Sequence, residues 1–143
     1  MIFLQKCRKG GIISAKEGEY MVIHKSAEDY LETMLVLKER HGYIRSVDIA
    51  DELNVKKPSV TYITKRLREN GYITMDQNSL ITLTDSGMDI AQRIYKRHKL
   101  LIRFLCHLGV DEEVARADAC KIEHDISDDT FEAINRHMES MEH

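Results

Sequence analysis

The chain has 143 residues, of which 31% are charged, 43% hydrophobic and 6% aromatic, with seven glycines and a single proline. This composition excludes a disordered, collagen-like or low-complexity chain, and it suits one ordinary domain or two small ones. No apolar run reaches the roughly 18–20 residues of a membrane span. Residues 1–4 are apolar, but Lys6 follows at once, so the start of the chain lacks the apolar segment of a signal peptide. Because three cysteines are an odd number, a disulfide framework is not expected, and we predict a reduced, cytoplasmic protein.

Charge is distributed unevenly along the chain. Residues 1–110 contain 18 Lys and Arg against 13 Asp and Glu, a net charge of +5. Residues 111–143 contain three basic residues against 11 acidic ones, a net charge of −8. A basic front part and an acidic end indicate two separate tasks, binding of a polyanion and binding of a cation.

Residues 1–22 lack a sustained hydrophobic period and a recognisable helix cap. The codons for residues 16–18 can contain a bacterial ribosome-binding sequence at a suitable distance before the codon of Met21. We therefore assign residues 1–22 to a leader or a disordered N-terminal arm. In the leader interpretation, residues 1–20 are a translated leader and Met21 is the natural start. The two alternatives stay open, and N-terminal sequencing of the native protein separates them.

Residues 23–84 show the element order of a winged helix-turn-helix. Apolar residues at helical spacing predict a first helix that starts at Ser26 and ends near residue 41. A short helix over 47–53 follows, and a third helix starts at Pro58 and ends before Gly71. Two β-prone runs, at 72–75 and 80–83, flank a polar turn and predict a hairpin wing.

Residues 85–143 read as a helical domain. The first helical pattern of this part ends near residue 108, and Gly109 separates it from a second pattern over 111–126. A third pattern begins after a cap at Ser127. Cys106 is expected in the core of this domain. The predicted fold class is therefore mainly α: an N-terminal winged helix-turn-helix with a small β-hairpin wing, followed by a helical domain that is large enough to dimerise.

The third predicted helix and its lead-in are strongly basic, with five Lys and Arg against one Glu in residues 56–70. A recognition helix presents its N-terminal residues to the major groove, where hydroxyl and basic groups contact bases and phosphates. The alternative is a solvated amphipathic helix of a protein-binding winged helix. We predict DNA contacts from this helix and from the hairpin tip, through Lys56, Lys57, Ser59, Thr61, Tyr62, Lys65, Gln77 and Asn78.

Potential metal ligands recur at helical spacing. Cys120, Glu123 and His124 share one helix face, Asp29 and Glu32 share another, and His98 lies on the long helix. A thiolate, a carboxylate and an imidazole together suit Fe²⁺, Co²⁺ or Zn²⁺, whereas more carboxylate favours Mn²⁺. Each residue also has an ordinary structural interpretation: Cys120 as core, the Glu123–His124 pair and His98 as surface groups, and Asp29 as a first-turn acid.

Taken together, these segments resemble the diphtheria-toxin-repressor family of metal-dependent repressors, and within it the short manganese-regulator branch. The resemblance covers about residues 25–140 and rests on SAEDYLE at 26–32, IA at 49–50, PSVT at 58–61, LTDSG at 83–87, RHKLL at 97–101 and DACKIEH at 118–124. It implies Fe²⁺ or Mn²⁺ as the cofactor, with Co²⁺, Ni²⁺ or Zn²⁺ as substitutes, and the ligands Asp29, Glu32, His98, Cys120, Glu123 and His124.

The sequence combines features of two branches of that family. Asp29 and Glu32 match the manganese regulators, whereas Cys120 matches the iron regulators, because the manganese branch has a Glu there. Ile102 and Arg116 stand where the iron branch has extra ligands of an ancillary site, so an ancillary site of the iron type is not expected.

The resemblance implies a homodimeric repressor of iron or manganese uptake genes, not an enzyme. A divalent metal would fix the DNA-binding geometry of the dimer on a palindromic operator. Three alternatives stay open: a winged-helix regulator that responds to an organic ligand or to oxidation of Cys120, a metallohydrolase using His98, Cys120 and Glu123, and a structural zinc module.

Overall fold

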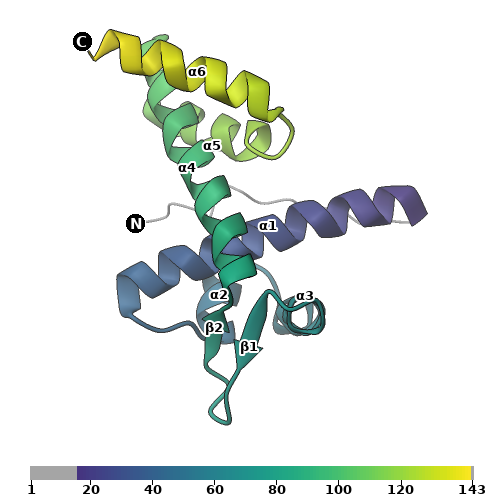
Figure 1. Cartoon of the computed structure of the whole chain (residues 1–143). Coiled ribbons are helices and arrows are strands. Elements are labelled where there is room, and N and C mark those ends of the chain that lie inside the picture. Colours follow the sequence, from purple (N-terminus) through teal and green to yellow (C-terminus); the bar gives the residue numbers. More distant parts are fainter. Residues whose placement is uncertain (1–15, 143) are drawn as a thin grey trace. The chain divides into compact units, whose positions relative to one another are not determined.

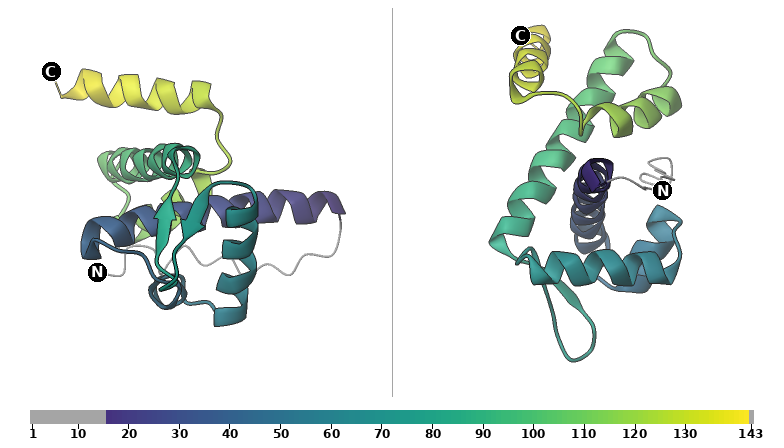
Figure 2. Two further views of the ribbon diagram at one scale, coloured as in Figure 1. Left: turned by 60° about the horizontal axis from the view of Figure 1, so that its bottom comes forward. Right: turned by 90° about the vertical axis from the view of Figure 1, so that its right-hand side faces the viewer.

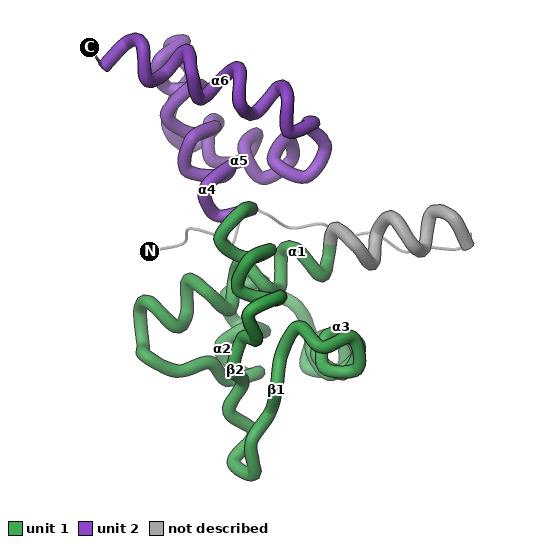
Figure 3. The backbone as a smooth tube through the Cα atoms, viewed as in Figure 1, with its two compact units in different colours: residues 1–93 green, residues 94–143 purple. Residues whose placement is uncertain are grey.

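The computed structural model describes the backbone of residues 16–142 and the side chains of residues 26–142 (Figure 1). The predicted leader or arm over 1–22 therefore lies outside the described side chains. The chain divides into two units, residues 1–93 and 94–143 (Figure 3). The described elements are, in order, α1 (Lys16–His41), α2 (Ser46–Leu53), α3 (Lys57–Glu69), β1 (Ile73–Met75), β2 (Ile81–Leu83), α4 (Asp85–His107), α5 (Glu112–Ile122) and α6 (Asp128–Met141).

The predicted fold class is confirmed: the described chain is mainly helical, with a two-stranded antiparallel hairpin after the helix-turn-helix. None of its helices is both long and apolar enough to cross a membrane. In the first unit, α1 contacts α2, α3 and β2, and α3 contacts β1. The shared core contains the buried side chains of Leu31, Met34, Leu37, Ile49, Val60, Leu67, Ile73 and Ile81.

The boundaries of α2 and α3 follow from local backbone preferences. Asn54 ends α2 in the left-handed conformation, with φ of 54°, which Asn tolerates better than most residues. Pro58 stands in the first turn of α3, where its missing N–H costs no hydrogen bond. Gly71, with φ of 78°, follows α3 and turns the chain into β1.

The wing is a hairpin held in register by one aspartate. Ile73 pairs with Leu83 and Met75 with Ile81. The Asp76 carboxylate accepts hydrogen bonds from the backbone N–H groups of residues 78 and 80, at 2.8 and 2.9 Å. Figure 1 and the right-hand view of Figure 2 show the hairpin tip extending beyond the helices of the first unit.

A tight junction connects the wing to α4. The Thr84 hydroxyl donates to the Gly71 carbonyl at 2.7 Å and accepts from the Gly87 N–H at 3.2 Å, so it caps the start of α4. A Cβ at Gly87 would lie 2.1 Å from the Tyr72 carbonyl oxygen, so the close approach of the two backbones requires glycine.

The second unit consists of the end of α4 with α5 and α6. Leu100, Phe131 and Met138 form its buried cluster, against which further apolar side chains of α4 and α6 pack. Asp111 caps α5 through the Glu113 N–H, and Ser127 caps α6 as predicted.

Two predicted helix boundaries are wrong. Helix α1 begins at Lys16 instead of Ser26, because a capping side chain contributes only about 1 kcal/mol and does not by itself stop a helix. Helix α5 ends at Ile122 instead of residue 126, and in the turn beyond it the carbonyl oxygens of Glu123 and Ile126 accept hydrogen bonds from Arg97 of α4. Cys106, expected in the core, is exposed in the last turn of α4.

Candidate metal centre and nucleic-acid interface

Three potential ligands meet in the interior of the second unit. His98 comes from α4, Cys120 from α5, and Glu123 is the C-cap residue of α5. His98 Nδ1 lies 2.6 Å from Glu123 Oε2 and 3.8 Å from Cys120 Sγ. The exposed fractions of the three residues are only 0%, 1% and 0%. One ligand atom from each lies within 4.8 Å of the others, which is close enough for one cation to bind all three.

His124 extends this group at the end of α5. Its Nε2 lies 3.3 Å from Glu123 Oε1, and its side chain is not exposed to solvent. His124 lies beyond the last residue of α5, but Glu123 keeps helical backbone angles. Cys120, Glu123 and His124 therefore still share one face, as predicted. The surface interpretations of His98 and of the Glu123–His124 pair are therefore wrong.

The protonation state of Glu123 suits a metal ligand. Burial alone raises the pKa of its carboxyl group. Hydrogen bonds from His124 and His98, together with their positive charge when protonated, outweigh burial and hold the pKa of Glu123 below its usual value. The carboxylate therefore stays ionised, as metal ligation requires.

Cys120 is almost completely buried beside His98, and the thiolate form of a cysteine is the one that ligates metal. With the thiolate present, the cluster offers sulfur, imidazole nitrogen and carboxylate oxygen, a donor set that fits Fe²⁺, Co²⁺ or Zn²⁺.

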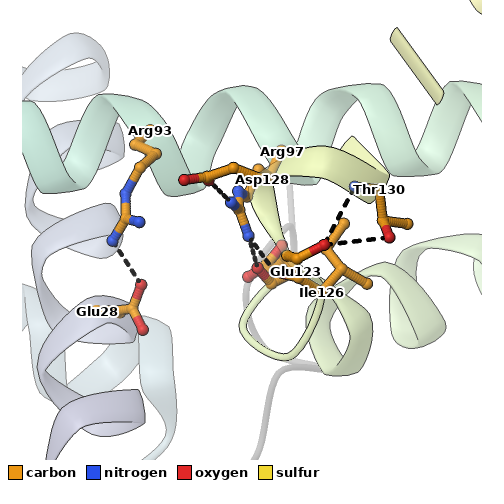
Figure 4. A network of polar contacts seen from close by, with 8 residues as sticks. Glu28, Arg93, Arg97, Glu123, Ile126, Asp128 and Thr130 are labelled. Atoms are coloured by element: carbon orange, nitrogen blue, oxygen red, sulfur yellow. Dashed lines mark hydrogen bonds and ion pairs between the residues drawn. The ribbon is translucent and has the colours of Figure 1, made fainter. Parts of the chain in front are cut away.

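In the first unit, two acidic residues of α1 are buried. Asp29 and Glu32 lie three residues apart, on one helix face, with exposed fractions of 7% and 0%. Burial of carboxylates is costly unless other groups or a cation compensate their charge. A neighbouring acid, Glu28, forms an ion pair with Arg93 at 3.4 Å (Figure 4).

Sequence reasoning missed one buried residue beside the cluster, Arg97. It is only 4% exposed, and it donates to the carbonyl oxygens of Glu123 and Ile126 and to the Asp128 carboxylate (Figure 4). The sequence does not indicate that Arg97 is buried or that it binds these carbonyl groups, because an arginine between Lys96 and His98 in a basic stretch is expected to be exposed to solvent.

The predicted DNA-contacting residues are all exposed on α3, its lead-in or the wing tip. Tyr62 is 49% exposed, and the Arg66 guanidinium lies 5.7 Å from its ring centre, a cation–π contact that supports the ring. The Thr61 hydroxyl donates to the Lys57 carbonyl at 3.0 Å, so only its acceptor capacity remains for DNA. The exposed set is Lys56, Lys57, Ser59, Thr61, Tyr62, Lys65, Gln77 and Asn78.

Fold and site define a winged-helix protein with a candidate cation site in a helical unit. Residues 23–79 match the iron dependent repressor N-terminal DNA binding domain, and residues 84–143 match the iron dependent repressor metal binding and dimerisation domain. The chain therefore belongs to the iron-dependent repressor family, the diphtheria-toxin-repressor family of metal-dependent transcriptional regulators that the sequence resembles.

Several relatives are similar over most of the chain. An HTH-type transcriptional regulator of Methanocaldococcus jannaschii is 39% identical over 117 residues, 80% of this chain and 94% of that protein. The regulator MntR of Bacillus subtilis is 38% identical over 109 residues, 76% of this chain and 77% of MntR.

Solved structures show the same fold. The manganese regulator SloR superimposes with a TM-score of 0.70 at 27% identity, over 79% of this chain and 53% of SloR. IdeR of T. acidophilum superimposes with a TM-score of 0.68 at 26% identity, over 89% of this chain and 55% of IdeR. The aligned part of this chain thus spans about half the length of these solved regulators.

Proposed function

We propose that this chain is a homodimeric, metal-dependent repressor of iron or manganese uptake genes that binds palindromic operators in the cytoplasm and catalyses no reaction. The single observation that carries the proposal is the buried His98–Cys120–Glu123 cluster within a domain of the metal-binding and dimerisation type. The comparisons support a manganese or iron signal, since SloR is named a manganese regulator and both matching family models describe iron dependent repressors.

The proposed ligand set combines both units of the chain. His98, Cys120, Glu123 and His124 belong to residues 94–143, and Asp29 and Glu32 belong to residues 1–93. Two observations support their assignment: the short distances within the first group, and the burial of two ionisable acids on α1. Oxygen-rich ligation favours Mn²⁺, while the Cys120 thiolate favours Fe²⁺, so the metal selectivity is decided by which donors bind together.

The proposed switch acts through charge. When bound, a divalent cation supplies the positive charge that lets acidic side chains of both units approach one site. The protein residues then fix the orientation of the DNA-binding domain, assigned to residues 23–84, relative to the dimerisation domain, assigned to 85–143. Only one orientation would present both recognition helices of a dimer to two half-sites. A roughly 100-fold gain in DNA affinity corresponds to about 2.7 kcal/mol of coupling.

Each DNA-contacting residue has an assigned part in this proposal. Lys56, Lys57 and Lys65 neutralise phosphates, while Ser59, Thr61 and Tyr62 reach base edges or phosphates in the major groove. Gln77 and Asn78 at the wing tip contact the adjacent minor groove or backbone. Their exposure and the net positive charge of α3 support these assignments.

Binding of Co²⁺ to the reduced chain tests the ligand set. We expect the wild type to bind Co²⁺ with a thiolate-to-cobalt charge-transfer absorption, and we expect this absorption to disappear in Cys120→Ser. Cys106→Ser, which changes an exposed cysteine of the same unit, is the matched control and should keep the absorption. Identical spectra from Cys120→Ser and the wild type would remove Cys120 from the site.

The alternative regulator, which would respond to oxidation of Cys120 and not to metal, is separated from this proposal by a chelator test. If oxidation is the signal, DNA binding changes with a thiol reductant in the continuous presence of a strict chelator. If metal is the signal, the chelator abolishes tight binding at every redox state.

A further inference from the structure

We propose that Arg97 is a positioning residue for the metal centre, which holds the main chain of Glu123 so that the ligands Glu123 and His124 are in place before metal binds. This inference rests on the proposed function, because it assumes that these residues ligate the metal. Arg97 contacts the main chain next to the candidate ligands and the Asp128 carboxylate, not the candidate ligand atoms themselves.

The contacts of Arg97 converge on the turn between α5 and α6. Its Nη1 donates to the Glu123 carbonyl at 3.2 Å and to the Ile126 carbonyl at 2.9 Å, and its Nη2 donates to the Asp128 carboxylate. The guanidinium carbon lies 5.4 Å from the ring centre of Phe131, which covers one face of the group. One side chain thus contacts the first, fourth and sixth residues of the segment 123–128.

A buried guanidinium suits this position for two physical reasons. The last carbonyl groups of a helix have no partner within the helix and form the negative end of its dipole, so a cation is stabilised there. The planar fork of arginine donates several hydrogen bonds in fixed directions, which a lysine ammonium does not reproduce. The carbonyl groups that Arg97 binds belong to residues just beyond the end of α5 at Ile122.

Adjacent residues of α4 therefore hold opposite ends of the same ligand. Arg97 binds the main-chain carbonyl of Glu123, and His98 lies 2.6 Å from its carboxylate. Because His124 follows Glu123 directly, its position also depends on the turn that Arg97 closes. Outer-sphere contacts of this kind orient ligands and affect metal affinity by about 10–100-fold.

The ion pair with Asp128 is the lesser part of this arrangement. The Asp128 side chain is 80% exposed, and ion pairs with exposed partners contribute little because water screens them. The two carbonyl contacts belong to a side chain that is only 5% exposed. The inference therefore assigns the positioning effect to the carbonyl contacts and makes Asp128 a useful comparison.

Mn²⁺ affinity of the reduced full-length chain, with Mn²⁺ alone as the probe, tests the inference. We expect Arg97→Lys to weaken Mn²⁺ binding by about 10–100-fold and to change the absorption spectrum of bound Co²⁺, because the ligands shift. Arg103→Lys is the matched control, since Arg103 lies on the same helix and pairs with the exposed Glu142. This control and Asp128→Asn should each change the affinity by less than about threefold. Equal affinities and spectra for Arg97→Lys and Arg103→Lys would refute the inference.

A measurement on the wild type keeps the inference testable if Arg97→Lys does not fold. In the metal-free reduced chain, we expect the backbone amides of residues 123–127 to be as ordered on the nanosecond timescale as those of α5, in nitrogen-15 relaxation experiments. A turn that becomes ordered only after Mn²⁺ is added would overturn preorganisation by Arg97. Failure of the wild type to bind Mn²⁺ at all would instead refute the proposed function, so the two failures are distinguishable.

Discussion

His98 Nδ1 lies 2.6 Å from Glu123 Oε2, and neither residue is exposed to solvent. The contact joins α4 to the end of α5 and places an ionised carboxylate beside an imidazole in the interior of one unit. Charged groups are buried in this way only when partners compensate them. The pair therefore forms the fixed part of the candidate metal centre, to which Cys120 and His124 are adjacent.

Removal of the Glu123 carboxylate should abolish the metal response. We expect Glu123→Ala to lose at least about 100-fold in Mn²⁺ affinity, more than the loss of an outer-sphere partner, because a direct ligand disappears. Metal-dependent DNA binding should be lost while the dimer remains. Glu132→Ala on α6, an exposed acid of the same unit, is the control for a change in net charge. Calorimetric titration with Mn²⁺ measures both variants, and equal affinities would exclude Glu123 as a ligand.

Tyr62 should contribute to DNA binding without affecting metal binding. The ring is 49% exposed on α3, so its removal leaves no cavity, and we expect Tyr62→Ala to weaken specific DNA binding by about 1–3 kcal/mol. Metal affinity in the absence of DNA should stay unchanged. Tyr43→Ala, which removes a tyrosine that is 42% exposed outside α3, is the matched control. Fluorescence anisotropy with operator and shuffled DNA gives both affinities. If Tyr62→Ala keeps wild-type affinity and base preference, α3 is not placed in the groove as proposed.

Gly87 should tolerate no side chain. In Gly87→Ala, the new Cβ would meet the Tyr72 carbonyl oxygen at 2.1 Å, and a backbone atom cannot move away as a flexible side chain does. We expect a loss of about 1–3 kcal/mol in the free energy of unfolding, typical of overpacking. Ser86→Ala changes the exposed neighbouring residue and should stay within about 0.5 kcal/mol. Urea unfolding compares the two variants, and equal stability would show that the junction between the wing and α4 is looser than described.

Tyr30 should couple stability to alkaline pH. Burial, with a smaller effect from the negative charge of Asp29, raises the pKa of Tyr30 from 10.0 to about 12. Since the folded state holds this proton more tightly than the unfolded state, the stabilisation is fully present below pH 10 and disappears as the pH rises to about 12. Two pKa units correspond to about 2–3 kcal/mol.

The variant Tyr30→Phe isolates this effect from the titration of other groups. Between about pH 9 and pH 11.5 the wild type should lose more unfolding free energy than Tyr30→Phe, because phenylalanine has no proton to release. Urea unfolding at several alkaline pH values measures the difference. Parallel pH profiles for the two proteins would mean that Tyr30 titrates normally in the folded state.

Local sequence signals predicted the order of the elements. The left-handed residue Asn54, the first-turn proline Pro58 and the glycine Gly109 act through their own backbone preferences, which the sequence displays directly. The two β-prone runs at 72–75 and 80–83 around a polar turn likewise predict the hairpin, which the structure confirms at Ile73–Met75 and Ile81–Leu83.

Tertiary contacts account for what the sequence did not predict. The guanidinium of Arg97 on α4 binds a carbonyl group just beyond the end of α5, and no pattern within α5 indicates this contact. Cys106 belongs to the apolar pattern of α4 but lies near its end, where the described chain leaves it exposed. The burial of His98 and Glu123 is a property of the pair, whereas each residue alone resembles a surface residue. The complete ligand set and the DNA contacts stay predictions.

The central claim, that metal binding controls DNA binding, is tested most directly by one titration. Reduced protein is titrated anaerobically with Mn²⁺, Fe²⁺, Co²⁺ or Zn²⁺ against DNA from upstream of a metal-transporter gene, with a chelator control for each ion. The account predicts tight binding only with metal, a gain of about 100-fold, and complete reversal by the chelator. Equal DNA affinity with metal and with chelator would contradict it.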